Sequence, residues 1–264
     1  NEMNLLIVLD ETCFFHPDFL DKLINKLDKS YNQKKILVGI VNKIPKKNNT
    51  NLAIIRYFYL FPFDQIFRLS IIYLFRNLMN IIFQSGYKES NFSVKGVCNK
   101  YKLKSFDIYQ NINQDVYIQK IKNFKPEILI SSNSLIFGKK LLNLPGIIFL
   151  NRHTSLLPSY GGPWPVLRAI INNEKKIGVT VHLMTQQIDA GEIVSQNIYN
   201  IKNKSLFSIY SETFELSAFT VFQAIKKIKS SKLKKIKNDF KKTYYRMPSK
   251  KDIKSFLDKG GKLI

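Results

Sequence analysis

Asn151 and His153 are the residues with the clearest potential for chemistry. They lie two positions apart at the end of a predicted strand, 147–151, and the two-residue period of a strand would place both side chains on one face. An Asn amide can donate hydrogen bonds to a developing oxyanion, and an imidazole can accept or relay a proton. The pair therefore indicates acyl transfer. If the amine of the substrate itself attacks, no Ser or Cys nucleophile is required.

A carboxylate would assist His153, because it would orient the imidazole and keep its basicity near neutral pH. Asp189 lies in a turn before Gly191 and can supply this carboxylate if the fold brings the turn back to the strand. Open α/β sheets carry their sites at the carboxyl ends of strands, and the Pro and Gly residues of 157–163 turn the chain away at that point. His182 lies within the predicted strand 179–184 and is interpreted as a structural residue.

Two aromatic residues, Tyr160 and Trp164, flank the glycines that follow His153. Their rings either pack the turn or form a platform for a sugar or a base, and both alternatives stay open. The three histidines and two cysteines follow no metal-ligand spacing, so we expect no metal. The chain also has no G-x-G-x-x-G, no P-loop and no G-x-S-x-G pattern, which weakens dinucleotide oxidoreductase, nucleoside triphosphatase and serine hydrolase interpretations.

The order of predicted elements is that of an α/β protein. Strands at 5–9 and 35–41 enclose a helix at 17–28, and helices and strands alternate again after residue 86, ending in a long amphipathic helix over 206–228. This alternation predicts a doubly wound, mostly parallel, Rossmann-like sheet with a helical insertion and a C-terminal helix and tail. We expect residues 1–200 to form the catalytic domain, with the insertion at 51–85. The helix and basic tail of 201–264 would belong to the same unit.

The segment 51–83 is apolar on nearly all sides. Arg56, Asp64, Arg68 and Arg76 interrupt it, so no uncharged run approaches the ~18–20 residues that span a bilayer. Charge placement and length favour a pair of helices buried in the domain or in a dimer contact. The alternative is an element that lies at a membrane surface.

The net charge is +23, from 42 basic and 19 acidic residues. Only six of the basic residues are Arg, whereas phosphate and base recognition favours the Arg fork. We therefore interpret the excess Lys as a solvated surface that could also attract an anionic small molecule, and we expect no nucleic-acid partner. Two cysteines are too few for a disulfide framework, which favours a reducing, cytoplasmic location.

The complete motif is Asn151-x-His153-x-Ser-Leu-Leu-Pro, followed by Gly-Val-Thr-Val-His over 178–182 and Asp189-Ala-Gly. It closely resembles the 10-formyltetrahydrofolate-dependent formyltransferases, strongly over 127–196 and weakly at the opening strands. The resemblance implies that Asn151, His153 and Asp189 are catalytic and that 10-formyltetrahydrofolate is the cosubstrate. It also implies a pterin pocket built by two loops, whose residues here are Ser132, Asn133, Ser134, Leu135, Ile136, Gln187 and Ile188. The aromatic pair Tyr160 and Trp164 is the candidate contact for the acceptor.

Family members differ in the amine that they formylate. The segment 9–16 has no glycine and two acids, unlike the phosphate-binding turn of glycinamide ribonucleotide formyltransferases. Methionyl-tRNA formyltransferases append a β-rich domain, which 201–264 does not resemble. The remaining class is the sugar N-formyltransferases. We expect a nucleotide-linked amino sugar, dTDP-4-amino-4,6-dideoxyglucose, as acceptor for O-antigen and lipopolysaccharide synthesis, and a homodimer with no integral membrane segment. The alternatives are a methionyl-tRNA or other folate-dependent formyltransferase, and a basic protein of the membrane surface without enzymatic activity.

Overall fold

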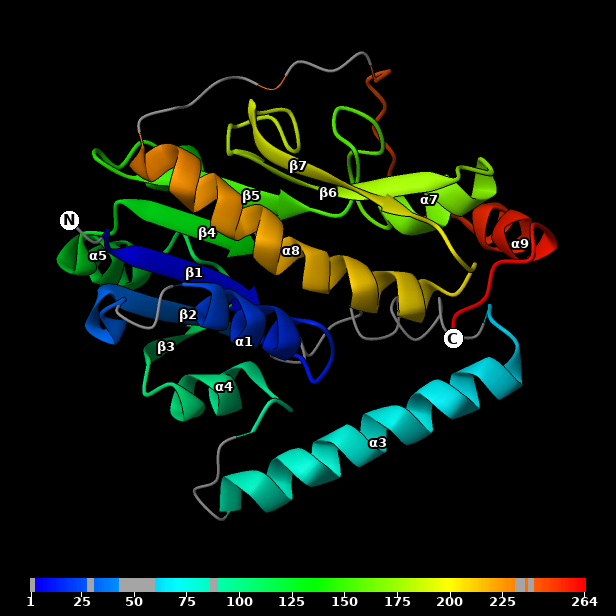
Figure 1. The fold of residues 1–264 in the computed structure, drawn as a ribbon, viewed down its shortest axis with the longest axis horizontal. Coiled ribbons are helices and arrows are strands. Elements are labelled where there is room, and N and C mark those ends of the chain that lie inside the picture. The colour runs from blue at the N-terminus through cyan, green and yellow to red at the C-terminus, as the bar shows by residue number, and fades with distance from the viewer. Residues whose placement is uncertain (1–2, 28–30, 43–59, 86–89, 231–235, 237–239) are drawn as a thin grey trace.

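Seven strands form one mixed sheet in the order β3-β2-β1-β4-β5-β6-β7 (Figure 1). The computed structural model describes residues 3–27, 31–42, 60–85, 90–230, 236 and 240–264. The strands are β1 (Leu5–Asp10), β2 (Ile36–Asn42), β3 (Lys104–Tyr109), β4 (Ile128–Ser132), β5 (Ile148–His153), β6 (Lys176–Leu183) and β7 (Ile193–Asn200). The strands β1 to β5 are parallel, whereas β6 and β7 run antiparallel to their neighbours. The prediction of a doubly wound, mostly parallel sheet is therefore confirmed.

Helices cover both faces of this sheet. They are α1 (His16–Lys26), α3 (Phe63–Ser85), α4 (Val94–Lys100), α5 (Asp115–Phe124), α6 (Lys139–Leu142), α7 (Pro165–Ile171), α8 (Leu206–Lys229) and α9 (Lys250–Asp258), with a short 3-10 helix η1 (Gln33–Lys35) before β2. The helices α1, α4 and α8 share one apolar core with the sheet, and α5 and α6 share the other. Such double coverage explains why the parallel strands are nearly continuous apolar runs.

The strand β1 demonstrates how the two cores divide. Its alternate side chains Leu5, Ile7 and Leu9 enter the core of α1 and α8, while Leu6 and Val8 enter the core of α5. All five are fully buried, and each contributes roughly 1.5–3 kcal/mol of hydrophobic stabilisation. The strand β1 pairs with β4, which in turn pairs with β5, and the cavity described below opens at the carboxyl ends of β4 and β5.

The helix α8 follows the prediction closely. It begins at Leu206, where the Ser205 side chain accepts the backbone N–H of Ser208, a capping contact worth about 1 kcal/mol. Its buried stripe includes Phe214, Ala218 and Val221. This stripe packs on α1 and on strands β6 and β7, so that Phe214 and Ser217 come to lie beneath β5.

The helix α3 corrects the prediction for 51–83. Residues 51–59 lie outside the described part of the chain, and the rest forms one helix along the edge of the molecule (Figure 1) rather than a buried pair. Its outward side is apolar, with exposed fractions of 79% at Phe63 and 64% at Leu74. The stretch Phe63–Phe83 is long and apolar enough to cross a membrane by length and composition, and none of it is buried inside the protein. The alternative of a helix pair buried within the domain is therefore wrong, and burial in a dimer contact stays a prediction.

The opposite side of α3 is attached to the body of the protein. Arg76 donates from Nε to the carbonyl oxygen of Cys13 and from Nη2 to that of Asn91 at 3.3 Å. The same guanidinium lies over the rings of Phe14 and Phe92. One charge that interrupts the apolar segment thus anchors the helix, while the outward stripe lies away from these contacts.

Two further elements differ from the sequence prediction. The predicted helix over 135–142 begins only at Lys139, so 135–138 remain a loop. The basic tail contains a helix, α9, which the prediction missed. A capping box between Ser249 and Asp252 begins α9, and Ile253 and Phe256 anchor it in a third apolar core with α7.

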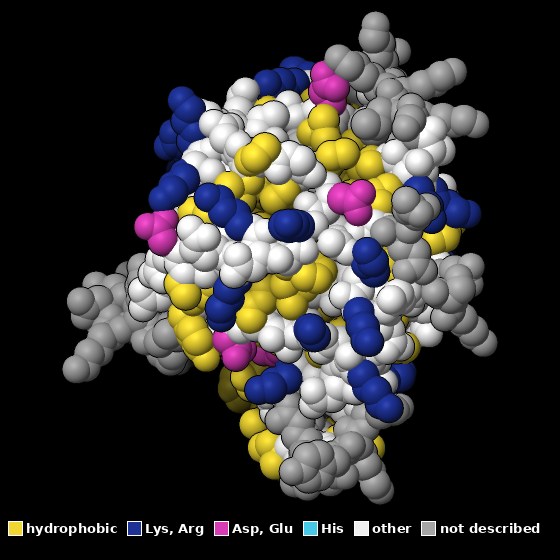
Figure 2. Space-filling view, turned by 90° about the vertical axis from the view of Figure 1, so that its left-hand side faces the viewer, with side chains coloured by type: hydrophobic (Ala, Val, Ile, Leu, Met, Phe, Trp, Pro, Cys, Tyr) yellow, Lys and Arg dark blue, Asp and Glu magenta, His cyan; other side chains and the backbone are white. Residues whose placement is uncertain are grey.

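The basic residues are spread over the surface. Figure 2 shows Lys and Arg side chains dispersed singly over one face of the molecule, interleaved with neutral side chains. On the described residues of this face they do not merge into one continuous patch. This arrangement is typical of a solvated surface.

Candidate active site

The strand β5 presents three successive polar side chains at its carboxyl end. Asn151 and His153 lie on one face, as their spacing predicts, and Arg152 lies between them on the other. The next strand, β6, pairs with β5 so that His182 is directly opposite Asn151. This pairing is antiparallel, whereas β4 pairs with β5 in parallel. The candidate site therefore lies where the sheet changes from parallel to antiparallel.

Asp189 reaches these residues from the loop between β6 and β7. Its backbone has a φ of 53°, in the left-handed region that Asp tolerates better than most residues. The loop passes close to β6 because a Cβ on Gly191 would lie only 1.7 Å from the carbonyl oxygen of Leu183. From the other side, the backbone N–H of Gly162 donates to Asp189 Oδ2 at 2.8 Å. The carboxylate is thus fixed by the backbone.

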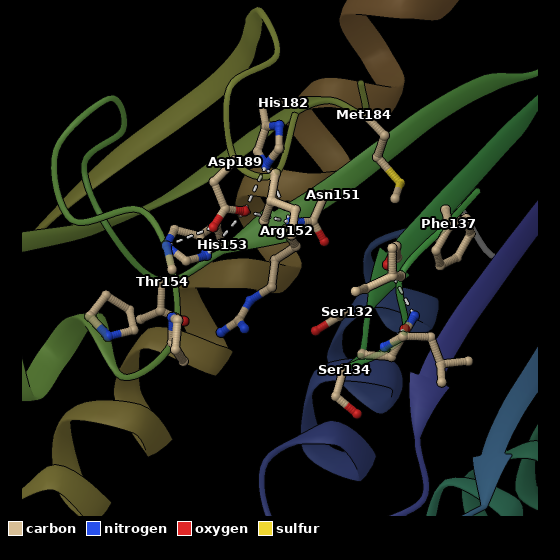
Figure 3. A pocket seen from close by; sticks show the side chains of 18 of the residues that line it. Ser132, Ser134, Phe137, Asn151, Arg152, His153, Thr154, His182, Met184 and Asp189 are labelled. Carbon is tan, nitrogen blue, oxygen red and sulfur yellow. Dashed lines mark hydrogen bonds and ion pairs between the residues drawn. The ribbon is translucent and has the colours of Figure 1, made fainter. Parts of the chain in front are cut away.

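The other oxygen of this carboxylate, Oδ1, faces three side chains. Asp189 Oδ1 lies 3.7 Å from His153 Nδ1 and 3.7 Å from His182 Nε2. It also accepts a 3.4 Å hydrogen bond from Asn151 Nδ2. Figure 3 shows Asn151, His153 and His182 gathered around Asp189. The structure therefore brings the three predicted residues together, beside one open cavity.

His182 belongs to this cluster, although the sequence analysis assigned it only a structural role. Its Nδ1 atom lies 2.9 Å from the carbonyl oxygen of Leu183, to which it can only donate. The Nε2 atom then accepts from Asn151 Nδ2 at 3.2 Å. His182 consequently fixes the orientation of the Asn151 amide. The position of His182 opposite Asn151 follows from the pairing of β5 with β6, and it cannot be predicted from the sequence of either strand alone.

The two hydrogens of Asn151 Nδ2 are both engaged. One points to His182 Nε2 at 3.2 Å and the other to Asp189 Oδ1 at 3.4 Å. The second bond is long for N–H···O and correspondingly weak. This hydrogen is therefore the one that could move to an oxyanion. The amide oxygen accepts no hydrogen bond from the cluster.

Burial sets the ionisation of His153. Desolvation lowers the pKa of His153 below its ordinary value, although the Asp189 charge acts in the opposite direction. Its Nε2 atom lies 3.0 Å from the carbonyl oxygen of Tyr160 and so carries a hydrogen. At neutral pH the ring is thus neutral, with its basic lone pair on Nδ1, on the side of Asp189. This is the state that a proton acceptor requires.

Asp189 remains ionised under the same conditions. Burial by itself would raise the pKa of Asp189. The contacts with His182 and His153 and the hydrogen bond from the N–H of Gly162 outweigh this effect and lower the pKa to about 2. The cluster therefore combines a neutral imidazole with a permanent negative charge, an arrangement that stabilises an imidazolium once it forms.

An open cavity of about 490 Å³ lies beside the cluster. All seven residues expected to bind the cofactor line it, namely Ser132, Asn133, Ser134, Leu135, Ile136, Gln187 and Ile188. The loop after β4 is held by Asn133, whose Nδ2 donates to the carbonyl oxygen of Val8 and whose Oδ1 accepts the N–H of Leu135. Ile136 and Ile188 are 71% and 49% exposed at its mouth.

Neither aromatic candidate for the acceptor lines the cavity. The Tyr160 ring stacks on Tyr245 at 5.7 Å and its hydroxyl donates to Glu174, so only its carbonyl oxygen reaches His153. Trp164 precedes α7 and packs against the third apolar core. The structure thus favours packing of the turn over a platform for both rings. Several cavity residues were not singled out by the sequence, among them His16, Arg152, Met184, Tyr210 and Phe214.

Metal chemistry has no evident location in this part of the protein. Within the ranges that the structure describes, there is no group of three or more His, Cys, Asp or Glu side chains that could hold a metal ion. The two cysteines, Cys13 and Cys98, are free and buried.

A family model described as Formyl transferase matches residues 82–218, which contain β4 to β7 and every member of the cluster. The chain belongs to the formyl transferase family. A methionyl-tRNA formyltransferase from Thermotoga neapolitana is 41% identical over 93 residues, covering 35% of this chain and 30% of that protein. The chain spans about a third of the length of these curated relatives.

Solved structures of formyl transferases share the fold. An N-formyltransferase from Helicobacter canadensis, in complex with folinic acid and dTDP-3-aminofucose, matches with a TM-score of 0.57 and 17% identity over 92% of this chain and 71% of that one. A phosphoribosylglycinamide formyltransferase from Anaplasma phagocytophilum matches with a TM-score of 0.58 and 14% identity over 94% and 100%. At this identity the likeness establishes the architecture, and the choice of amine rests on other arguments.

Proposed function

We propose that the protein transfers a formyl group from 10-formyltetrahydrofolate to the primary amine of a small acceptor. The observation that carries this proposal is the convergence of Asn151, His153 and Asp189 beside one open cavity. Family membership agrees with it. The proposal treats these three residues as catalytic.

The folate would bind between the loop after β4 and the loop before Asp189. The cavity has the volume of a small-molecule site, about 300–1,000 Å³. Ile136 and Ile188 offer exposed aliphatic surface on its two sides, which suits the flat faces of a pterin. Asn133 holds the loop after β4 in place beside this surface. These residues therefore fit the cosubstrate.

Each residue has a distinct part in the transfer. The unprotonated amine attacks the formyl carbon, and the new C–N bond forms while the oxygen gains negative charge. Asn151 moves its weaker hydrogen bond from Asp189 to this oxygen. His153 accepts a proton from the attacking amine at Nδ1, directly or through water, and Asp189 stabilises the resulting imidazolium. As the bond from carbon to N10 of the folate breaks, the proton can pass to that nitrogen.

We propose a nucleotide-linked amino sugar as the acceptor, with dTDP-4-amino-4,6-dideoxyglucose as the first candidate, and a place in O-antigen and lipopolysaccharide synthesis. Support comes from the missing glycines at 9–16, from the fold shared with a protein solved with dTDP-3-aminofucose, and from a surface rich in Lys. The direct test offers a panel of nucleotide amino sugars together with 10-formyltetrahydrofolate. Mass spectrometry should detect the gain of one formyl group on one of them, and no gain on any sugar would exclude this acceptor class.

Transfer to initiator tRNA is the second candidate, because curated relatives at 35–41% identity are methionyl-tRNA formyltransferases. Filter binding of tRNA at two salt concentrations separates the two classes. A tRNA enzyme should bind tightly at low salt and weaken steeply as salt rises. Formylation of charged initiator tRNA in the same preparation would settle the choice in favour of this candidate.

We propose a homodimer whose interface is the outer stripe of α3, and we propose a cytoplasmic location from the family match. The stripe contains Phe67, Ile71, Leu74, Leu78 and Ile81, at spacings of three and four residues along one side. In a symmetric dimer the same stripe of a second copy can cover it, which is how most homo-oligomers bury such surfaces. In the lower part of Figure 2, where α3 lies in Figure 1, apolar side chains reach the surface. Sedimentation with anionic vesicles would instead support the membrane-surface alternative.

A further inference from the structure

Arg152 is a buried cation with no carboxylate partner. It is only 8% exposed, and none of the ion pairs between described residues includes it. Its Nε donates to Ser217 Oγ at 2.8 Å, and its Cζ lies 3.6 Å above the ring of Phe214. The Nη2 atom is buried without any hydrogen-bond partner.

Burying Arg152 in this way destabilises the fold unless a bound anion balances its charge. Removing a guanidinium from water without a counter-charge costs several kcal/mol, and an unsatisfied buried donor adds about 1–3 kcal/mol. Burial lowers the pKa of Arg152 to about 9, so the group is still charged at neutral pH. An aliphatic side chain would pack under β5 at lower cost. Stability alone therefore does not explain a charge here.

Arg152 lines the same cavity as the catalytic cluster but on its other side. Because strand side chains alternate, it points away from Asn151 and His153, and Figure 3 shows it directed toward the side of the cavity where Ser132 lies. The groups around it come from α1 and α8, with His16, Tyr210 and Phe214 lining this part of the cavity. Asp10 of β1 also lines the cavity, where it accepts a hydrogen bond from Ser134 at 3.3 Å.

We infer that Arg152 binds an oxyanion, a phosphate or a carboxylate, that the acceptor carries close to its reactive amine. The inference rests on the proposed function for the word acceptor, but the anion site itself can be tested without it. Arg152, Asn151 and His153 line one cavity, so an anion on Arg152 and an amine beside His153 can belong to one bound acceptor. A planar fork that can donate two parallel hydrogen bonds suits either anion. An acceptor without an anionic group would leave the charge of Arg152 without a counter-charge.

The test compares the full chain with Arg152→Met, which keeps the length of the side chain and removes its charge. Thermal unfolding is followed as inorganic phosphate, pyrophosphate or acetate is added at constant ionic strength. Arg68→Met is the matched control, because Arg68 is exposed on α3 and its loss changes the net charge equally. Ser217→Ala removes the hydrogen bonds of this hydroxyl to Arg152 and Thr213 and keeps the charge of Arg152. Binding of folinic acid to each variant reports on the folate side of the cavity.

We expect at least one anion to raise the melting temperature of the wild-type protein and of Arg68→Met. In Arg152→Met the affinity for that anion should fall about tenfold or more, while folinic acid binds as before. Pyrophosphate as the best probe identifies a diphosphate on the acceptor, and acetate identifies a carboxylate. If Arg152→Met does not fold, Arg152→Lys replaces it, and it should bind the anion more weakly because the fork is lost.

Equal anion responses in the wild type, Arg152→Met and Arg68→Met would overturn the inference, because the response would then be a general property of a basic surface. A lower melting temperature of Arg152→Met without any change in anion binding would also overturn it, by assigning Arg152 a packing role. These readouts involve no formyl transfer. A protein that binds the anion through Arg152 but formylates no amine would contradict the proposed function and leave the anion site intact.

Discussion

Asp189 faces Nδ1 of His153 across 3.7 Å, while Nε2 of the same ring is fixed 3.0 Å from the carbonyl oxygen of Tyr160. A backbone carbonyl can only accept, so the proton of the neutral ring stays on Nε2. The nitrogen that gains and loses a proton is therefore the one beside the carboxylate. This relationship makes the cluster a proton acceptor whose charged form is stabilised in advance.

Replacing His153 should remove this acceptor. We expect His153→Asn to lower kcat by ~10²-fold or more, the usual contribution of general acid–base catalysis. The affinity for folinic acid should change little, because the cofactor loops do not depend on this ring. Steady-state kinetics with the identified acceptor, together with folinic acid titration, make the comparison. A kcat close to that of the wild type would remove His153 from the mechanism.

Asp189→Asn should alter the pH dependence as well as the rate. Removing the carboxylate removes an influence that raises the pKa of His153, so this pKa falls further. The acid limb of the rate profile should move to lower pH, while the plateau falls because the imidazolium loses its counter-charge. A purely structural role for Asp189 would lower the plateau and leave the acid limb in place.

The same carboxylate makes the stability depend on pH. The folded-state pKa of about 2 lies below the ordinary value of 3.8, so the stabilisation, about 2 kcal/mol, is present above pH 4. It is lost as the pH falls from about 4 to about 2. Urea unfolding at pH 6 and pH 2.5 should reveal a smaller loss of stability in Asp189→Asn than in the wild type. Equal losses in both proteins would contradict this assignment.

Gly162→Ala should damage both the fold and the site. The φ of Gly162 is 90°, and a Cβ there would lie 2.0 Å from the carbonyl oxygen of Tyr245. Gly146→Ala is the matched control, because its φ is 76° with no atom within 4 Å. The control should cost only the strain of the left-handed backbone, about 1–2 kcal/mol. Gly162→Ala should lose more stability and also activity, since the Gly162 N–H holds Asp189.

The proposed dimer interface on α3 can be tested by placing a negative charge on its apolar stripe. Leu74 and Leu78 lie on its outward side, so Leu74→Glu and Leu78→Glu should each change the free energy of unfolding of the monomer by only about 0.5 kcal/mol, as surface substitutions do. Light scattering coupled to size exclusion should then detect a monomer where the wild type is a dimer. Leu69→Glu is the control on the inward side, next to the third apolar core, and should destabilise the fold. An unchanged mass in all variants would leave the dimer proposal without its interface.

The helix α9 should be required for folding. Phe256 is fully buried, and removing such a ring costs about 3–5 kcal/mol. Phe256→Ala should therefore lower the midpoint of urea unfolding in a single transition shared by the whole described chain. A separate early transition, with the remainder unaffected, would mean that 201–264 is not part of the same unit.

The spacing of apolar and polar residues along the chain was sufficient to predict the strands of the sheet and the pair Asn151 and His153. Period two along β5 predicted that Asn151 and His153 share a face, and apolar runs predicted the strands around them. His182 could not be predicted, because its role depends on the register of β6 against β5. Register is a property of two strands, and neither sequence contains it alone.

Two errors have a common physical origin. Apolar content suggested that the segment 51–83 is buried within the domain. Hydrophobicity measures the free energy gained when apolar surface leaves water, and it does not identify the surface against which a segment packs. The tail was predicted only as a basic segment without a helix of its own, yet Ile253 and Phe256, three positions apart, pack a helix against the third apolar core. In both cases the tertiary partner, and not the local composition, decided the outcome.

The antiparallel pairing of β5 with β6 has a consequence for how the protein can vary. Asn151 and His182 are opposite each other only in one alignment of the two strands, and a slip by a single residue would turn His182 toward the opposite face. The segment that connects these strands can therefore change in sequence where it preserves that alignment and the backbone contacts of Tyr160 with His153 and of Gly162 with Asp189. An engineered insertion inside either strand would instead dismantle the cluster while leaving most of the hydrophobic core able to form.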